Sequence, residues 1–466
     1  MHLNNRKKIR FLAEAEMIYK AALAEVDPGH LIRSSVIRKN SQLIIQGQTF
    51  NLKSFSNVYV AGLGKAAPFM AKGLLSVVGD YLKGGIVLHL PQEKIFLEGI
   101  QSLPAPHPLP DQRSVVAARR ILSLAETLSQ DDLLIVLISG GGSAQASLPA
   151  AGLPLQEKKI IIDGLLKAGA NIRELNIVRK HLSRIKGGCL AQAAYPASVI
   201  SLIISDVIHN DLESIASGPT YWDSSTYEDA YQVLRKYNLW SSAPLSVKKI
   251  IKKGIERKLK ETLKENDSIF QKVHNFIIGD NSKALGAAKE KAEQLSFQTS
   301  ILTSFDQGEA KQMAKYYASF LFNLASSPNT SLKPICFLAG GELTVTVRGK
   351  GKGGRNQEFV LAFLLEASQR WSGEVDWLVM SLGTDGIDGP TEAAGAWASP
   401  STLNQMGRLG IPAEIYLKNN DSYHFFKNVG GLIVTGPTHT NVMDIRLFMI
   451  DTTRKHSQNG DECDSS

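Results

Sequence analysis

Leu133-Leu-Ile-Val-Leu-Ile-Ser-Gly-Gly-Gly-Ser-Ala144 decides the fold, because it joins an apolar strand to a glycine-rich loop. Three consecutive glycines can present successive backbone N–H groups to an oxyanion at the start of a helix. A flexible turn is the alternative, but the strongly apolar strand before the loop argues against it. No GxxxxGK[ST] sequence occurs in the chain, so the loop is not a P-loop. The stretch predicts a nucleotide phosphate site formed by Ser139, Gly140, Gly141, Gly142 and Ser143.

Apolar runs and helical patterns alternate through most of the chain, which predicts an α/β fold with mostly parallel sheets. Such sheets bind ligands beyond the carboxyl ends of their strands. Strands are expected at 58–61, 85–90, 133–138, 199–204, 276–278, 299–302, 335–339, 343–347, 378–382 and 432–435. Helices are expected at 66–78, 113–128, 155–168, 280–295 and 357–368.

The length of 466 residues is too great for one ordinary core and predicts two domains. Residues 240–267 form a polar, lysine-rich stretch without a strand, so we expect the domain boundary near residue 265. The N-terminal domain would then span 1–265 and the C-terminal domain 266–454, followed by a disordered polar tail at 455–466.

Composition excludes several classes of protein. The three cysteines have no CxxC spacing, which argues against a disulfide framework or zinc site and for a reducing compartment. Glu14 and Glu16 interrupt any signal-peptide core, and no apolar run approaches the roughly 20 residues of a membrane helix. The net charge of +8 is dispersed, which suits anionic small molecules better than nucleic acid. We expect a cytoplasmic protein without membrane or nucleic-acid partners, and a homodimer is left open.

A second strand-to-helix turn, Val60-Ala-Gly-Leu-Gly-Lys-Ala-Ala67, contains Gly62, Gly64 and Lys65. A lysine beside a helix N-terminus can hold an anion together with free backbone amides. The turn also matches GxGxxA, a loose dinucleotide fingerprint that needs an acidic residue at the end of the next strand. That strand ends at His89-Leu90-Pro91 without an acid, so binding of a nicotinamide dinucleotide is disfavoured.

Carboxylates follow several of the predicted strands. Gly383-Thr-Asp-Gly-Ile-Asp-Gly-Pro390 carries Asp385 and Asp388 after an apolar run, and Asp206 and Glu342 also follow strand-like segments. Mg²⁺ prefers a few carboxylates together with phosphate oxygens and water. The sequence predicts a Mg²⁺ site at Asp206, Glu342 and Asp385, with Asp385 or Asp388 orienting and deprotonating an acceptor hydroxyl. It does not decide which carboxylate is the base and which is the ligand.

Basic side chains cluster in two places. Arg179 and Lys186 lie near one face of a predicted helix and are expected to bind a substrate carboxylate or phosphate, although a solvated basic face is the alternative. The loop 349–358 is expected to be mobile and cationic, and its Arg355 could neutralise charge on a transferring phosphoryl group. Asn356 beside it and Asn441 in a C-terminal loop are further candidates for substrate binding.

Seven stretches in order, between about residue 10 and residue 450, resemble the class II glycerate kinase family. They are GxGKAA at 62–67, SGGGSA at 139–144, NxVRKHLSxIKGG at 176–188, SDVxxNDxxxIASGPT at 205–220, GGExTVTVRGxGxGGRNQE at 340–358, GTDGIDGPTxAAGA at 383–396 and TxTNVxD at 438–444. Pro106 departs from the family, which often has glycine there, but the change removes no candidate catalytic group.

The resemblance implies a Rossmann-like N-terminal α/β domain facing a smaller α/β C-terminal domain of the MOFRL type, with the active site in the cleft between them. It implies ATP-dependent phosphorylation of D-glycerate to 2-phosphoglycerate, with ATP and Mg²⁺ as cofactors. The Lys of GxGKAA and the Arg of GGRNQE are held to be essential in that family, which implies catalytic roles for Lys65 and Arg355.

Two other functions compete with this one. An NAD(P)H-dependent hydroxypyruvate reductase would use the GxGxxA match at 62–67, and the missing ribose acid counts against it. A non-catalytic sensor of sugar acids would bind its ligand in the same fold, but it would have no need for the carboxylates at Asp206, Glu342 and Asp385.

Overall fold

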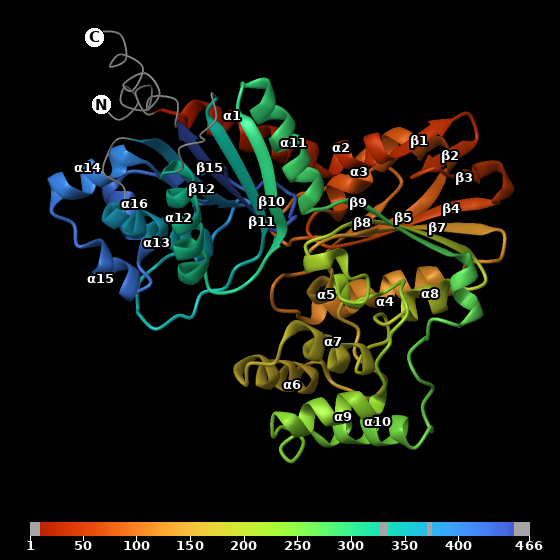
Figure 1. Cartoon of the computed structure of the whole chain (residues 1–466). Coiled ribbons are helices and arrows are strands. Elements are labelled where there is room, and N and C mark those ends of the chain that lie inside the picture. Colours follow the sequence, from red (N-terminus) through yellow and green to blue (C-terminus); the bar gives the residue numbers. More distant parts are fainter. Residues whose placement is uncertain (1–9, 327–332, 371–374, 452–466) are drawn as a thin grey trace, which may run out of the picture. The chain divides into compact units, whose positions relative to one another are not determined.

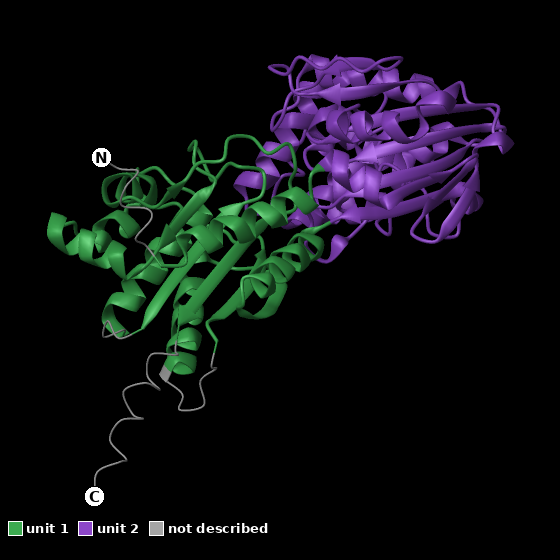
Figure 2. Cartoon of the chain, turned by 90° about the horizontal axis from the view of Figure 1, so that it is seen from above, with its two compact units in different colours: residues 1–27, 280–466 green, residues 28–279 purple. Residues whose placement is uncertain are grey.

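A computed structural model describes residues 10–326, 333–370 and 375–451. The chain divides into two compact units, shown in different colours in Figure 2: unit 1 comprises Met1–Asp27 and Asp280–Ser466, and unit 2 comprises Pro28–Gly279. The division falls after Gly279 rather than near residue 265. The first helix, α1 (Leu12–Glu25), belongs with the C-terminal part of the chain, because it packs against α11 (Asn281–Gln294). The predicted tail at 455–466 lies outside the described residues.

Unit 2 is built on a six-stranded, fully parallel sheet with the strand order β6-β5-β4-β7-β8-β9. Numbered within the sheet this order is 3-2-1-4-5-6, the order of the Rossmann fold, so the expected Rossmann-like fold is confirmed. The order reverses between β4 and β7, which are neighbours. The strands are β4 (Asn57–Leu63), β5 (Leu82–His89), β6 (Gln101–Pro104), β7 (Asp132–Ile138), β8 (Ser198–Ile204) and β9 (Val273–Gly279).

Helices cover both faces of this sheet, which is why its central strands read as continuous apolar runs. Every residue of β7 is buried. In Figure 1, α2 and α3 lie on one side of the sheet and α4, α5 and α8 on the other. Asp111 begins α4 with a capping box that it forms with Ser114. These helices are α2 (Pro28–Ser35), α3 (Ala67–Val78), α4 (Gln112–Glu126), α5 (Gly142–Gln145) and α8 (Cys189–Ala194).

Four further helices of unit 2 form a separate apolar cluster of their own. They are α6 (Leu155–Lys167), α7 (Ile172–His181), α9 (Tyr227–Lys236) and α10 (Leu245–Ile255), seen together at the bottom of Figure 1. The lysine-rich stretch that suggested a domain boundary therefore contains α10, whose apolar side packs in this cluster. A small antiparallel sheet completes the unit: β1 (Val36–Lys39), β2 (Gln42–Ile45) and β3 (Gln48–Asn51).

Unit 1 contains a mixed sheet, so the expectation of mostly parallel sheets is wrong here. β15 runs antiparallel between β11 and β12, and it was not predicted. Residues 343–347 were expected to form a strand, but only Leu343 among them is buried and they form one isolated bridge, from Thr344 to Glu309. The strand order is β10 (Gln298–Asp306), β11 (Ile335–Gly341), β15 (Asp444–Asp451), β12 (Asp376–Gly383), β13 (Gly395–Ala398) and β14 (Leu432–Ile433).

The apolar core of unit 1 centres on α13, most of which is buried. This helix spans Arg355–Arg370, and the other helices of the unit include α12 (Ala310–Ser326), α14 (Pro400–Leu409), α15 (Ala413–Lys418) and α16 (Ser422–Val429). Among the described residues of both units, no helix combines the length and apolar character that crossing a membrane requires.

Candidate active site

The loops after β4 and β7 contact each other where the strand order of unit 2 reverses. Gly64 N–H donates to Gln145 Oε1 at 2.9 Å, and Ala66 N–H donates to Ser139 Oγ at 3.0 Å. Lys65 N–H donates to the Gly140 carbonyl at 2.9 Å. Open α/β sheets bind ligands at such a reversal point. The structure therefore joins two of the sequence motifs, GxGKAA and SGGGSA, into one loop cluster.

The loop amides are only partly available to a ligand. Gly142 N–H donates to the Ser139 carbonyl at 3.2 Å, so it closes a turn instead of facing an anion. For the amides of Gly140, Gly141 and Ser143, the described residues supply no hydrogen-bond partner. The amides available to an anion are therefore those of two glycines and one serine, and not those of three successive glycines as predicted.

Gly141 has a positive φ of 84° and lies under two larger side chains. A Cβ atom on Gly141 would come within 2.8 Å of His107 Cδ2 and 3.3 Å of Lys65 Cγ. The stem of Lys65 and the His107 ring therefore pack directly on the loop, which places the Lys65 chain beside the available amides.

We expect Gly141→Ala to weaken ATP binding at least tenfold, because the methyl group displaces Lys65 or His107 and the backbone leaves the left-handed region. Gly152 is the matched control, since its φ is 78° but a Cβ there would meet nothing within 4 Å. Both variants should lose about 1–2 kcal/mol of stability from the backbone alone. Calorimetric titration with ATP separates them, and equal affinities in the two variants would contradict the prediction.

A pocket of about 350 Å³ opens beside this loop cluster. Arg179 and Lys186, both predicted to bind substrate, line it, and so do Gly141 and Ser143. The Lys186 ammonium donates to the Ser143 carbonyl at 2.7 Å and to Ser143 Oγ at 2.8 Å, so it holds the loop as well as charging the pocket. Burial lowers the pKa of Lys186. Lys158 of α6 also lines the pocket and was missed in the sequence.

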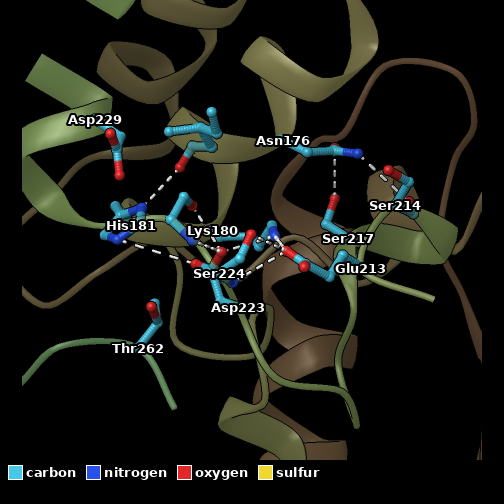
Figure 3. A network of polar contacts seen from close by, with 12 residues as sticks. Asn176, Lys180, His181, Glu213, Ser214, Ser217, Asp223, Ser224, Asp229 and Thr262 are labelled. Atoms are coloured by element: carbon cyan, nitrogen blue, oxygen red, sulfur yellow. Dashed lines mark hydrogen bonds and ion pairs between the residues drawn. The ribbon is translucent and has the colours of Figure 1, made fainter. Parts of the chain in front are cut away.

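A buried polar network fixes α7, the helix that carries Arg179 (Figure 3). Lys180 Nζ lies 2.8 Å from Asp223 Oδ1 and 2.9 Å from Glu213 Oε2. Burial opposes the charged form of Asp223, but Lys180 and His181 together lower its pKa. The charged state of the network therefore holds α7 firmly in place.

The same network reaches the glycine-rich loop. Ser217 Oγ donates to Asn176 Oδ1 at 3.0 Å and lies 2.9 Å from Ser143 Oγ. Figure 3 shows Asn176 and Ser217 side by side at one end of the network. Because Ser143 also contacts Lys186, the glycine-rich loop and Lys186 share these hydrogen bonds with Asn176 of α7, the helix that also carries Arg179.

In unit 1, Arg355 is the first residue of α13 and forms a two-pronged ion pair with Asp444. Its Nε lies 2.7 Å from Asp444 Oδ2 and its Nη2 lies 2.9 Å from Oδ1. Its Nη1 lies 2.8 Å from Glu342 Oε1. Burial opposes the charge, but Asp444 and Glu342 raise the pKa of Arg355 overall. The guanidinium therefore stays charged in a fixed orientation, and Asp444 is a site residue that the sequence reasoning did not assign.

Asp388 and Asn356 contact the start of α13 and Asp444, and so help to position Arg355. The Asp388 carboxylate accepts hydrogen bonds from the amides of Asn356 at 3.0 Å and Gln357 at 2.9 Å, at the start of α13. Asn356 Nδ2 donates to Asp444 Oδ1 at 3.0 Å. Burial raises the pKa of Asp388 to about 6. Asp388 was expected to act on the acceptor hydroxyl and Asn356 to bind substrate; both are buried, and the contacts they make orient α13 and Asp444.

Asp385 is the more accessible of the two carboxylates in the GTDGIDGP stretch. Its Oδ1 accepts from Ile387 N–H at 3.1 Å. A Cβ on Gly383 would lie 3.4 Å from Asp385 Oδ1 and 3.6 Å from Asp444 Oδ1, so both carboxylates border the same space. Asn441 lies in the loop before β15, where its Oδ1 accepts from Met443 N–H at 3.1 Å.

The loop before Arg355 is anchored by its backbone, against the expectation that it is mobile. Gly349 N–H donates to Asn420 Oδ1 at 3.0 Å, and Lys352 N–H donates to Asp421 Oδ1 at 2.8 Å. A Cβ on Gly351 would meet Asp421 Cβ at 2.3 Å. The glycines therefore allow the backbone of this loop to pack closely against the turn before α16. This contact fixes the loop that leads into Arg355.

The three predicted metal ligands fall in different units. Asp206 follows β8 in unit 2, whereas Glu342 and Asp385 follow β11 and β12 in unit 1. Across the part of the chain that the structure describes, no group of three or more His, Cys, Asp or Glu side chains could hold a metal ion. The carboxylates present fit an ion that also takes ligands from a phosphate group, since Mg²⁺ is commonly bound by one or two carboxylates.

Comparison with known proteins gives a consistent result. Residues 14–252 match the family described as "Domain of unknown function (DUF4147)", and residues 335–444 match the MOFRL family. The chain is 39% identical to a glycerate 2-kinase of Pyrococcus horikoshii, over 93% of this chain and 96% of that protein. It is 38% identical to a D-glycerate 2-kinase of Thermotoga maritima, over 86% of this chain and 93% of that protein. The crystal structure of a glycerate kinase from Thermotoga maritima matches with a TM-score of 0.82 at 35% identity, over 94% of this chain and 99% of that chain. The chain therefore belongs to the glycerate kinase family that its sequence motifs resemble.

Proposed function

We propose that the protein transfers the γ-phosphoryl group of ATP to the 2-hydroxyl of D-glycerate, giving 2-phosphoglycerate and ADP. The observation that carries the proposal is the loop cluster where the strand order of unit 2 reverses, with Lys65 packed beside amides that find no partner among the described residues. Two relatives that match this chain over most of its length are named glycerate 2-kinase and D-glycerate 2-kinase. Since ATP is the donor, we propose a cytoplasmic location.

Phosphoryl transfer requires positioning and compensation of negative charge more than covalent chemistry. Gly140, Gly141 and Ser143 would donate their amide N–H groups to phosphate oxygens of ATP. Lys65 would neutralise charge on the transferring group, and Arg355 would do so from its fork with Asp444. Asp385, the accessible carboxylate, would accept the proton of the attacking hydroxyl.

Mg²⁺ would be held by Asp385 and Glu342, with Asp206 as a further candidate ligand, and it would offset the charge of the phosphates when bound. These acids support a site that is complete only with ATP, because only two of the proposed ligands, Glu342 and Asp385, lie in unit 1, and Glu342 is already paired with Arg355. The remaining charge on the transferring group is then met by Lys65 and Arg355.

The test is an assay of purified protein with ATP, Mg²⁺ and D-glycerate that follows ADP release and identifies the product by NMR. Release of ADP that depends on D-glycerate, with 2-phosphoglycerate as product, is the expected result. Oxidation of NADH by hydroxypyruvate without ADP release would instead assign a reductase. That outcome is disfavoured by β5, which ends at His89 without an acid to bind the ribose. Binding of glycerate without turnover would assign a sensor.

Lys65→Met should lower kcat/KM for ATP by about 10²-fold or more, because a preorganised charge near the transferring group is lost. Lys72→Met is the control, since Lys72 is an exposed lysine in α3, the helix that follows Lys65. Steady-state rates with varied ATP give the comparison. Similar kcat/KM values for the two variants would remove Lys65 from the mechanism.

A further inference from the structure

Lys158 is a buried cation for which the described residues supply no hydrogen-bond partner. The residue is 4% exposed, and within the described ranges its ammonium nitrogen makes no hydrogen bond. Burying a charged group without a partner is costly, so such a group either loses its charge or meets an opposite charge from a ligand. Lys158 lines the pocket of about 350 Å³ beside the glycine-rich loop, so a ligand can reach it.

The charges around this pocket are almost all positive. Lys158, Lys159, Arg179 and Lys186 line it, against one acid, Asp163. Burial, reinforced by the charge of Arg179, lowers the pKa of Lys158 to about 7. The described residues supply no hydrogen-bond partner for the Arg179 guanidinium either. The pocket is therefore arranged to receive an anion that carries more than one negative charge.

Part of the pocket wall is apolar, and this limits which anions fit the pocket. Leu109 and Leu166 are 61% and 50% exposed and stand at its rim, and Leu155 and Ile162 line it further. A small hydroxy acid has no apolar surface to place against these side chains. The base of a nucleotide does have apolar surface that could pack against them. The pocket volume also lies at the lower end of the range of about 300–1,000 Å³ that small-molecule sites occupy.

We propose that this pocket is the nucleotide subsite, with Lys158 and Arg179 on the phosphates of ATP and the aliphatic wall of Leu109, Ile162 and Leu166 against the base. The inference rests on the proposed function and deepens it, because it assigns Lys158 a direct contact with ATP. Lys186 contributes its charge while it holds Ser143. Bound phosphate would supply the partner that the Lys158 ammonium lacks.

Lys158→Met tests the phosphate contact, because methionine keeps the length of the side chain and removes its charge. We expect the Kd for the β,γ-imido analogue of ATP, measured by calorimetry without D-glycerate, to rise at least tenfold. The KM for D-glycerate should change less than twofold. Lys167→Met, on the exposed end of the same helix, is the matched control and should bind the analogue like the wild type.

Ile162→Ser tests the contact with the base. It should weaken binding of the ATP analogue severalfold but leave binding of inorganic tripolyphosphate unchanged, whereas Lys158→Met should weaken both. An unchanged Kd for the analogue in Lys158→Met overturns the proposal. A raised KM for D-glycerate with unchanged analogue binding overturns it too, and assigns the pocket to the acid.

Stability provides an independent readout on Lys158. Its folded-state pKa lies below the usual 10.5, so the unfolded chain binds more protons between about pH 7 and 10.5 and stability rises with pH across that window. The groups that face it are Lys159, Asp163, Arg179, Lys186 and His107. In Lys158→Met the rise in Tm with pH should be smaller, and Tm at pH 7 should be equal to or above that of the wild type. A clear fall in Tm at pH 7 would mean a structural partner and would contradict the proposal.

The proposed function can fail separately from this subsite. If the wild type forms no 2-phosphoglycerate but the Kd of the ATP analogue depends on Lys158, the subsite stands and the reaction assigned to the protein is wrong. If the wild type makes 2-phosphoglycerate and Lys158→Met binds the analogue normally, the reaction stands and the subsite is wrong.

Discussion

Arg355→Met should lower kcat for glycerate phosphorylation by about 10³-fold, with a much smaller change in KM for D-glycerate. An arginine that meets charge on a transferring phosphoryl group contributes 10³–10⁵ in kcat where it has been measured. In this protein the guanidinium is held by Asp444 and Glu342, so it needs no rearrangement to meet that charge. Steady-state kinetics with saturating ATP provides the measurement.

The control for Arg355→Met is Arg370→Met, at the other end of the same helix. Arg370 is 45% exposed and pairs with Glu366 one turn earlier. Its replacement should leave kcat within twofold of the wild type. If Arg355→Met instead raised KM and left kcat intact, Arg355 would contribute to substrate binding in general and not to the transition state.

Asp444→Asn should destabilise unit 1 by about 3–5 kcal/mol, the usual cost of removing one partner from a buried ion pair. The Asp444 side chain is fully buried and contacts Arg355, Asn356 and Arg446. Arg446 is also fully buried, and the variant would leave it with Asp306 as its acidic partner. Hydrogen exchange of the β15 amides should accelerate accordingly.

The matched control for Asp444→Asn is Asp80→Asn, which removes an exposed partner of Arg38. Asp80 is 79% exposed, so its pair should contribute less than about 1 kcal/mol. If exchange in β15 remained at the wild-type rate in Asp444→Asn, the buried charges would be compensated by contacts other than this carboxylate. Activity should fall together with stability, because Arg355 loses its two-pronged ion pair with Asp444.

The parallel sheet could be predicted because its strands are apolar on both faces. Leu133–Ile138 and Val199–Ile204 read as strands without any tertiary information. The central strand of unit 1, Asp444–Asp451, could not be found in the same way. It is buried along its whole length but contains Asp444 and Arg446, whose charges are compensated by residues distant in sequence.

The site residues show the same difference between what the sequence pattern reveals and what depends on tertiary contacts. Lys65 and Arg355 stand in dense glycine motifs and were identified, whereas their positions relative to Gly141 and Asp444 depend on tertiary contacts. Lys158 had one signal: it lies three residues after Leu155 and four before Ile162 on a helix, at a spacing that apolar residues normally occupy. Helical periodicity marked that position as inward-facing, but it could not show that a pocket lay there.

The assignment of α1 to unit 1 has a consequence for the order in which the protein can be made. The helix leaves the ribosome before any part of unit 2, yet α11, against which it packs, is synthesised more than two hundred residues later. The whole sequence of unit 2 is synthesised before α11. The apolar face of α1, with Ala15, Ile18 and Tyr19, can be covered only after α11 has been made. A fragment that stops at Gly279 would carry this helix with nothing to cover it, and a fragment that starts at Asp280 would lack it. Expression of either unit alone should therefore begin from Pro28–Gly279, or from residues 280–451 with residues 10–27 rejoined to them.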